Sequence, residues 1–193
     1  MQFYFSRICE ATSALSKHPS PKVGAQAFEY WTTLVEDETE RMSKGVMCMG
    51  YIRGCFENLL QMILQGISMV SFEEDDEDED WGHALSAACC LQKLSIFIGN
   101  DIMDTVVGFA ASNIQSADWK LRYSACISLG SITEGPDKQK FLDLMLSALP
   151  SLLSMFNDKN AKIREALSWV FHRICEHHPD FVSNKQVADE FIP

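Results

Sequence analysis

The feature that most constrains this chain is an internal repeat with a period of about 40 residues. Residues 118–134 align with residues 160–176 at an offset of 42, and a lysine, an aliphatic residue, an arginine and the final glutamate coincide. Residues 20–36 and 81–94 align with the same segment at offsets of 98 and 38. Apolar residues in these segments recur every three or four positions, which is the period of an amphipathic helix. The sequence therefore contains four copies of one helix.

Another apolar helix precedes each copy, so the predicted unit is a helix pair. One pair cannot bury both of its faces, and such units are stable only when they stack on neighbours. HEAT and armadillo arrays share this pattern, but the pairs leave no room for a third helix, which favours HEAT. We therefore predict an all-α, right-handed α-α superhelix, a HEAT-repeat solenoid forming a single array over residues 1–193. The pairs are expected at residues 1–36, 44–98, 100–135 and 137–178, with 181–193 opening a truncated fifth pair.

Two arginines occupy equivalent positions near the start of the second helix in the last two pairs. These are Arg122 and Arg164. Either could reach an acidic side chain of an adjoining turn, such as Asp118 or Asp158, and so link neighbouring repeats. The alternative is an arginine exposed on a helix surface, which contributes little to stability.

One acidic run dominates the charge of the chain. The net charge is −11, and eight consecutive carboxylates at residues 73–80 leave the other residues with only −3. No basic stripe exists to follow a phosphate backbone, so we expect no direct nucleic-acid binding. The run should form a solvated loop over residues 72–80, because adjacent carboxylates repel one another and bury no apolar surface. Its members are Glu73, Glu74, Asp75, Asp76, Glu77, Asp78, Glu79 and Asp80.

A tryptophan follows this run at the junction with the next helix. Trp81 could stack on an arginine or lysine while the carboxylates neutralise its charge. Trp31, Trp119 and Trp169 lie at a similar phase of their repeats. For each of these three, core packing and ligand contact remain equally open. For the acidic loop itself, the alternative is a solubilising segment without a partner.

The sequence predicts no enzyme. Phosphate-binding loops, dinucleotide fingerprints, nucleophile elbows and zinc-protease motifs are all missing, so we expect no catalytic residue, no cofactor and no metal. Cys175 and His178 would supply only half a metal site. The seven cysteines are scattered, which is typical of reduced thiols in a cytosolic or nuclear protein. The most apolar stretch, residues 46–70, contains Arg53 and Glu57, so we expect no membrane span.

Several segments, taken together and in order, resemble the importin-β (karyopherin-β) family of nuclear import receptors. They are residues 28–31, the acidic loop with its tryptophan, and residues 118–122, 134–136, 148–150 and 169–176. The resemblance runs across essentially the whole chain and covers a fifth to a quarter of such a receptor.

The resemblance implies a carrier rather than an enzyme. It implies a receptor that binds the basic N-terminal helix of importin-α or other basic cargo and whose cargo is released by the GTP form of Ran. Such a receptor shuttles between cytoplasm and nucleus through the nuclear pore in the nuclear envelope. By position, Glu73 to Asp80 would be its acidic loop, Trp81 and Trp169 its stacking rings, and Glu36, Asp37 and Glu38 a second acidic turn. Phe5 and Ile8 would lie near a groove for phenylalanine-glycine nucleoporins. The alternative function is a HEAT-repeat scaffold subunit of a multiprotein assembly.

Overall fold

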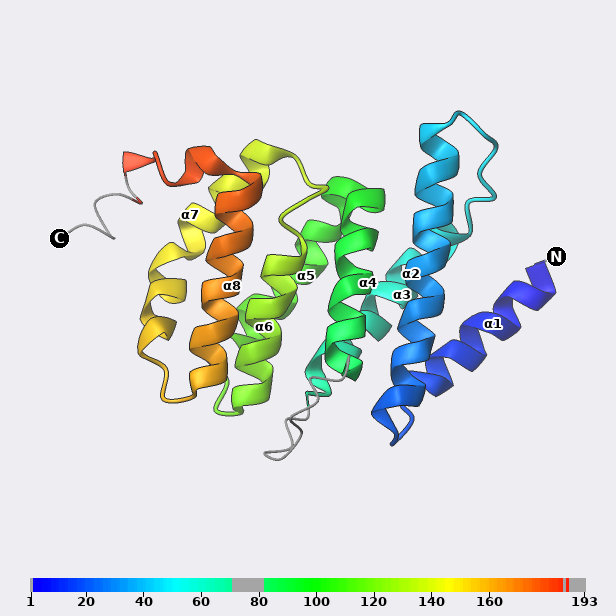
Figure 1. The fold of residues 1–193 in the computed structure, drawn as a ribbon, viewed down its shortest axis with the longest axis horizontal. Helices are drawn as coiled ribbons and strands as arrows, with labels where there is room; N and C mark the ends of the chain where they lie inside the picture. Colours follow the sequence, from blue (N-terminus) through cyan, green and yellow to red (C-terminus); the bar gives the residue numbers. More distant parts are fainter. Residues whose placement is uncertain (1, 71–81, 186, 188–193) are drawn as a thin grey trace. The chain divides into compact units, whose positions relative to one another are not determined.

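The computed structural model describes residues 2–70, 82–185 and 187, and all regular structure within them is helical (Figure 1). The all-α prediction is confirmed. The α-helices are α1 (Gln2–Leu15), α2 (Pro21–Ser43), α3 (Tyr51–Ser68), α4 (His83–Ile98), α5 (Met103–Asn113), α6 (Trp119–Ser131), α7 (Lys138–Ser154) and α8 (Ala161–His177). Three short 3-10 segments accompany them: η1 (Gly99–Ile102), η2 (Met155–Asn157) and η3 (Pro179–Phe181). The helices fall into two compact units, Met1–Phe97 and Ile98–Pro193.

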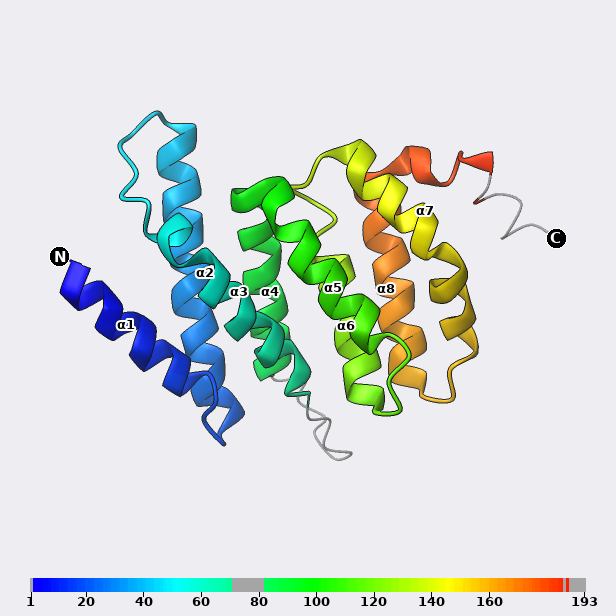
Figure 2. The same ribbon diagram turned by 180° about the vertical axis from the view of Figure 1, so that it is seen from behind.

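The first unit consists of two layers of helices. Figure 1 has α2 and α4 towards the viewer, whereas α1 and α3 come to the front in the reverse view of Figure 2. Large apolar side chains from both layers meet in between. The fully buried ones include Phe28, Ile52, Leu60, Ile63, Leu91 and Leu94.

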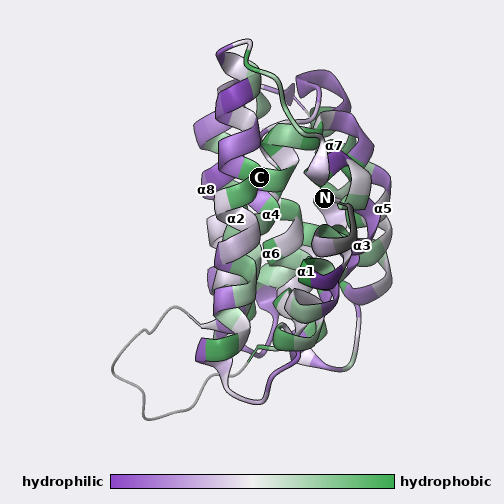
Figure 3. Ribbon diagram, turned by 90° about the vertical axis from the view of Figure 1, so that its right-hand side faces the viewer, coloured by the Kyte–Doolittle hydropathy of each residue, from purple (hydrophilic) through white to green (hydrophobic). Residues whose placement is uncertain are grey.

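The second unit repeats this arrangement, with α6 and α8 in one layer and α5 and α7 in the other (Figures 1 and 2). Its core is again made by apolar residues at helical spacing, among them Ile102, Phe141, Met145, Leu149, Leu167, Val170 and Ile174. The outer side of α8 is mainly hydrophilic (Figure 3). Each pair thus buries one stripe of each helix against the other layer.

Polar residues placed just before α6, α7 and α8 explain where these helices begin. The side chains of Asp118, Asp137 and Asn160 accept hydrogen bonds from the backbone N–H groups of Lys120, Lys140 and Lys162, at 2.9, 3.1 and 2.9 Å. These bonds satisfy amides that have no partner within the first turn of a helix.

The stretch His83–Asn113 is long and apolar enough for a membrane span by length and composition. It is not one continuous α-helix, because η1 interrupts it at Gly99, whose φ is 74°. Ala87, Leu91 and Leu94 in α4 are fully buried within the protein. Its apolar character is therefore used in packing against other helices.

The helix bounds differ from the expected pairs in one respect: α2 continues seven residues past position 36, to Ser43. Most of the expected fifth pair, residues 186 and 188–193, lies outside the described residues.

Candidate protein-binding surfaces

The acidic segment and its tryptophan, Glu73 to Asp80 and Trp81, lie outside the described residues. The structure describes their flanks, since α3 ends at Ser68 and α4 begins at His83. The segment therefore joins the two helices of the second pair.

The three carboxylates of the second acidic turn have different surroundings. Glu36 lies on the surface and pairs with Lys93 of α4 at 2.8 Å, and Asp37 pairs with Arg41 at 2.7 Å. About half of each of these two carboxylate side chains is exposed, at 51% and 49%. A partner could reach both of them, but it would compete with the basic residue already bound.

Glu38 points into the protein instead, and the residue is only 2% exposed. Its carboxylate accepts hydrogen bonds from the backbone N–H groups of Tyr51 at 2.9 Å and Ile52 at 3.3 Å. These amides open α3, where the helix dipole also favours a negative charge. The side chain from the end of α2 thus caps the next helix, and its oxygens are occupied.

The tryptophans of the described residues separate into core and surface types. Trp31 is buried, and its indole N–H donates to Thr12 Oγ1 at 3.0 Å. Trp119 and Trp169 are partly exposed. The six-membered ring of Trp169 lies against α6 at Gly130, where an added Cβ would come within 2.4 Å of the ring carbon Cζ3. Any larger residue at position 130 would push this indole away from α6.

Phe5 and Ile8, the residues expected near a nucleoporin groove, lie on α1. The Phe5 ring stacks on Tyr51 of α3, with ring centroids 4.6 Å apart, and meets Trp31 edge-on at 6.0 Å. Phe5 therefore holds the two first helices of adjacent pairs together. Ile8 is 36% exposed and belongs to an apolar stripe with Tyr4 and Leu15.

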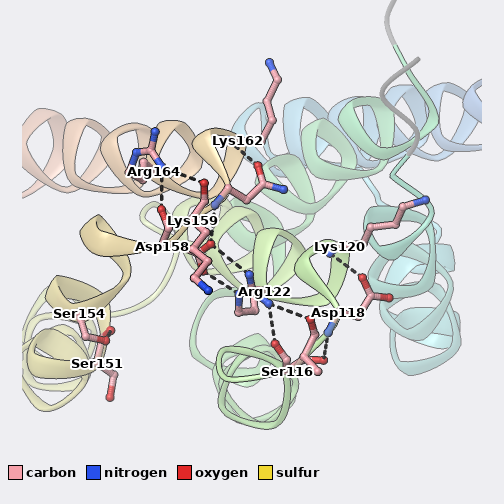
Figure 4. Close-up of polar contacts among 12 residues, drawn as sticks. Ser116, Asp118, Lys120, Arg122, Ser151, Ser154, Asp158, Lys159, Lys162 and Arg164 are labelled. Carbon is pink, nitrogen blue, oxygen red and sulfur yellow. Dashed lines mark hydrogen bonds and ion pairs between the residues drawn. The ribbon is translucent and has the colours of Figure 1, made fainter. Parts of the chain in front are cut away.

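The expected arginine link between repeats is present in the second unit (Figure 4). Arg122 of α6 binds Asp158 through two hydrogen bonds, Nε to Oδ2 at 2.8 Å and Nη2 to Oδ1 at 3.1 Å. Its Nη1 donates to the carbonyl of Ser116 at 2.7 Å. The hydrogen bonds from Arg122 lower the pKa of Asp158. Arg164 donates only to backbone carbonyls, those of Asp158 at 2.6 Å and Lys159 at 3.3 Å.

A second ionic cluster at the other end of α6 and α8 was not predicted. Arg173 binds Glu134 at 2.9 Å and Glu176 at 3.1 Å, and His177 Nε2 lies 3.2 Å from Glu134. The repeat alignment placed Glu134 and Glu176 at the same phase, so one signal of this cluster was available in the sequence. The basic side chains are the more enclosed members, because Arg173 is only 15% exposed.

Cys175 and His178, the two residues of the half metal site, lie in different environments. Cys175 is exposed, whereas His178 is buried. The His178 ring stacks on Phe141 at 4.9 Å, and its Nε2 lies 2.7 Å from the Thr133 carbonyl oxygen. The histidine thus connects the end of α8 to the end of α6.

Comparison with known proteins identifies relatives of this chain. The HEAT repeat model matches residues 148–178, which cover the C-terminal end of α7 and all of α8. Importin subunit beta-1 of Saccharomyces cerevisiae is 30% identical over 186 residues, and importin subunit beta-1 of Schizosaccharomyces pombe is 27% identical over 195 residues. These alignments cover 91% and 95% of the chain. The chain is homologous to importin subunit beta-1. The predicted resemblance is confirmed.

Solved structures agree with this homology. The chain matches Kap95p, yeast importin-β, in its complex with Nup1, with a TM-score of 0.83, 28% identity and 92% of the chain covered. It also matches Kap95p in a structure in which binding makes the switch loops of RanGDP adopt the GTP-bound conformation, with a TM-score of 0.84, 27% identity and 93% of the chain covered. The HEAT-repeat fold class is thereby confirmed. The chain spans about a fifth of the length of these relatives, 21% or 22% in each case.

Proposed function

We propose that this chain acts as part of a nuclear transport receptor that carries basic cargo or importin-α through the nuclear pore under the control of Ran-GTP. The observation that carries the proposal is the homology to importin subunit beta-1 over nine-tenths of the chain. Kap95p, which the chain resembles, binds Ran in one of the solved structures and Nup1 in the other. A receptor of this kind would be located in the cytoplasm, in the nucleus and at the nuclear pore.

The proposed binding mechanism is electrostatic and aromatic capture of a basic helix. Glu73 to Asp80 would attract the helix, and Trp81 and Trp169 would stack on its basic side chains. Glu36 and Asp37 would add two half-exposed carboxylates on α2. Glu38 would support this surface only indirectly, because its carboxylate caps α3. Phe5 and Ile8 on α1 remain the proposed nucleoporin contacts.

Titration with a helical, arginine- and lysine-rich peptide tests the capture mechanism. Because exposed charges supply the attraction, affinity should fall steeply as salt rises. Replacing Glu73 to Asp80 by the matching amides should cost about tenfold or more in affinity. A control variant neutralises three exposed carboxylates outside the loop, Asp101, Asp104 and Asp143, and it should leave affinity nearly unchanged. Salt-independent binding, or equal losses in both variants, would reject the role of the loop.

Trp169 has its own test in the same titration. Trp169→Ala should weaken binding by the loss of one cation–π contact, roughly 1 kcal/mol, whereas Trp169→Phe should keep part of it. Binding unchanged in both variants would remove Trp169 from the mechanism.

A second candidate function is a HEAT-repeat scaffold whose acidic loop only keeps it soluble. Affinity capture with the chain distinguishes the two. Recovery of Ran-GTP and nucleoporins supports the transport receptor, whereas stoichiometric recovery of one catalytic subunit supports the scaffold.

A further inference from the structure

The turn between α1 and α2 contains the only serine or threonine in the sequence that is followed by proline. This step is Ser20-Pro21, and basic or titratable side chains flank it at Lys17, His18 and Lys22. Residues 11–28 contain no aspartate or glutamate. In a chain with a net charge of −11, this turn therefore carries a local excess of basic residues along the sequence.

Ser20 lies in a surface turn with exposed neighbours on both sides. Lys17, His18, Pro19, Pro21 and Lys22 are exposed, and Ser20 is partly exposed. Ser20 has φ −78° and ψ 118°, which is the extended backbone that a following proline favours. Its side chain makes no capping hydrogen bond to α2. An acceptor hydroxyl that no helix amide engages thus lies on an extended residue in the surface turn directly before α2.

We propose that Ser20 is a phosphorylation site for a proline-directed protein kinase. The γ-phosphoryl group of ATP is transferred to Ser20 Oγ: the new O–P bond forms as the bond to the β,γ-bridging oxygen breaks. The hydroxyl proton leaves to the base of the kinase, and ADP is the other product. This modification is independent of the proposed transport function.

The surroundings of Ser20 would stabilise the phosphate once it is attached. Ser20 is the N-cap residue of α2, so the phosphate would lie at the positive end of a 23-residue helix. A phosphoserine carries a charge of about −1.5 to −2 near neutral pH, and it stabilises a helix N-terminus. The His18 ring already contacts this turn, since its Nδ1 accepts the backbone N–H of Ser20 at 3.0 Å. Lys17 and Lys22 would add cationic partners within the same turn.

Phosphorylation of the folded chain in vitro tests the proposal. The protein is incubated with ATP and a purified proline-directed kinase, and the modified residue is mapped by mass spectrometry. We expect one phosphoryl group at Ser20, with incorporation lost in Ser20→Ala and reduced to the same level in Pro21→Ala. Ser43 of α2, which is exposed but precedes a lysine, serves as the internal control and should stay unmodified.

A synthetic peptide of residues 14–26 contains the Ser20-Pro21 sequence but not the folded turn. Comparing it with the folded protein shows whether the fold leaves Ser20 accessible to the kinase. Modification of both peptide and folded protein supports the proposal. Modification of the peptide alone, or of neither, would overturn it, because the folded turn would not then present Ser20. Circular dichroism of each variant checks that the total helix content is unchanged.

A phosphorus NMR titration examines the environment of the phosphate. In the folded protein, the helix terminus and the basic side chains should shift the second pKa of phosphoserine below its value in the phosphorylated peptide. Lys17→Ala and Lys22→Ala should each move the value back towards that of the peptide. Identical titrations of protein and peptide would show a phosphate without partners and would refute the stabilising role of the turn.

Discussion

At the scale of single residues, the buried carboxylate of Glu38 stabilises the start of α3. It accepts the first two amides of α3, and no described side chain of α3 itself caps that terminus. Glu38→Ala leaves these amides without a partner inside the protein, and hydrogen bonds to a charged group are the stronger kind. We expect a loss of about 2 kcal/mol in the free energy of unfolding by urea. The exposed neighbour Asp37→Ala is the control and should cost far less; equal losses would contradict a capping role.

His83 provides a pH dependence at the same scale. The ring is buried against Gly24 and Phe28, and burial lowers its pKa, opposed by a hydrogen bond to the Ser16 backbone. In the unfolded chain the pKa returns to about 6.5, so the unfolded state binds a proton more readily. The free energy of unfolding should therefore decrease as the pH falls below about 6.5, towards the lowered pKa of the folded state.

Urea unfolding between pH 5 and pH 8 measures this effect. His83→Gln should flatten the pH dependence, whereas His172→Gln, at an exposed position of α8, should leave it as in the native chain. An unchanged slope in His83→Gln would mean that the buried ring is not the titrating group.

At the scale of elements, the contact between Arg122 and Asp158 fixes one repeat against the next. Both side chains are largely enclosed, with 19% and 11% exposed, and the guanidinium binds the carboxylate through two bonds. Such bidentate pairs have more geometric specificity than exposed ion pairs. Arg122→Ala should destabilise the chain by roughly 2 kcal/mol, because it leaves Asp158 without its main partner.

Arg164→Ala is the matched control, since this equivalent arginine donates only to backbone carbonyls. It should cost less than Arg122→Ala in the same thermal or urea unfolding measurement. A larger loss for Arg164→Ala would show that the carbonyl contacts, not the ion pair, hold the turn.

The elements were more predictable from sequence than the contacts between them. Apolar periodicity and the repeat offset identified the helices, because burying one stripe per helix leaves a regular mark on the sequence. The alignment ended at residue 36, yet α2 continues to Ser43, where the i,i+4 pairs Asp37–Arg41 and Glu40–Lys44 support its exposed end.

The surface residues were harder to predict because their neighbours come from other helices. Glu36, Asp37 and Glu38 are consecutive, but only the third faces α3. The arginine link was predictable because Arg122, near the start of α6, and Asp158, in the turn before α8, lie at the same end of adjacent repeats. The partner of Trp169 was not, since nothing in its local sequence indicates that Gly130 opens a place for the ring.

At the scale of the whole molecule, a substitution in a helical array is expected to destabilise mainly the helices near it. Each repeat contacts its neighbours rather than the entire chain, so stability is close to a sum of local terms. The helices also divide into two compact units, Met1–Phe97 and Ile98–Pro193. Leu91 is fully buried in the first unit, and Val170 is fully buried in the second. Truncating either side chain leaves a cavity, which costs about 2–5 kcal/mol for leucine and less for the smaller valine.

Amide hydrogen exchange read helix by helix makes this expectation testable. Leu91→Ala should reduce protection mainly in α2, α3 and α4, whereas Val170→Ala should reduce it mainly in α6, α7 and α8, because local opening requires only the free energy of the weakened unit. The two variants serve as controls for each other. If either substitution lowers protection equally in all the described helices, the chain opens as one cooperative body, and the nearest-neighbour description does not hold for this array.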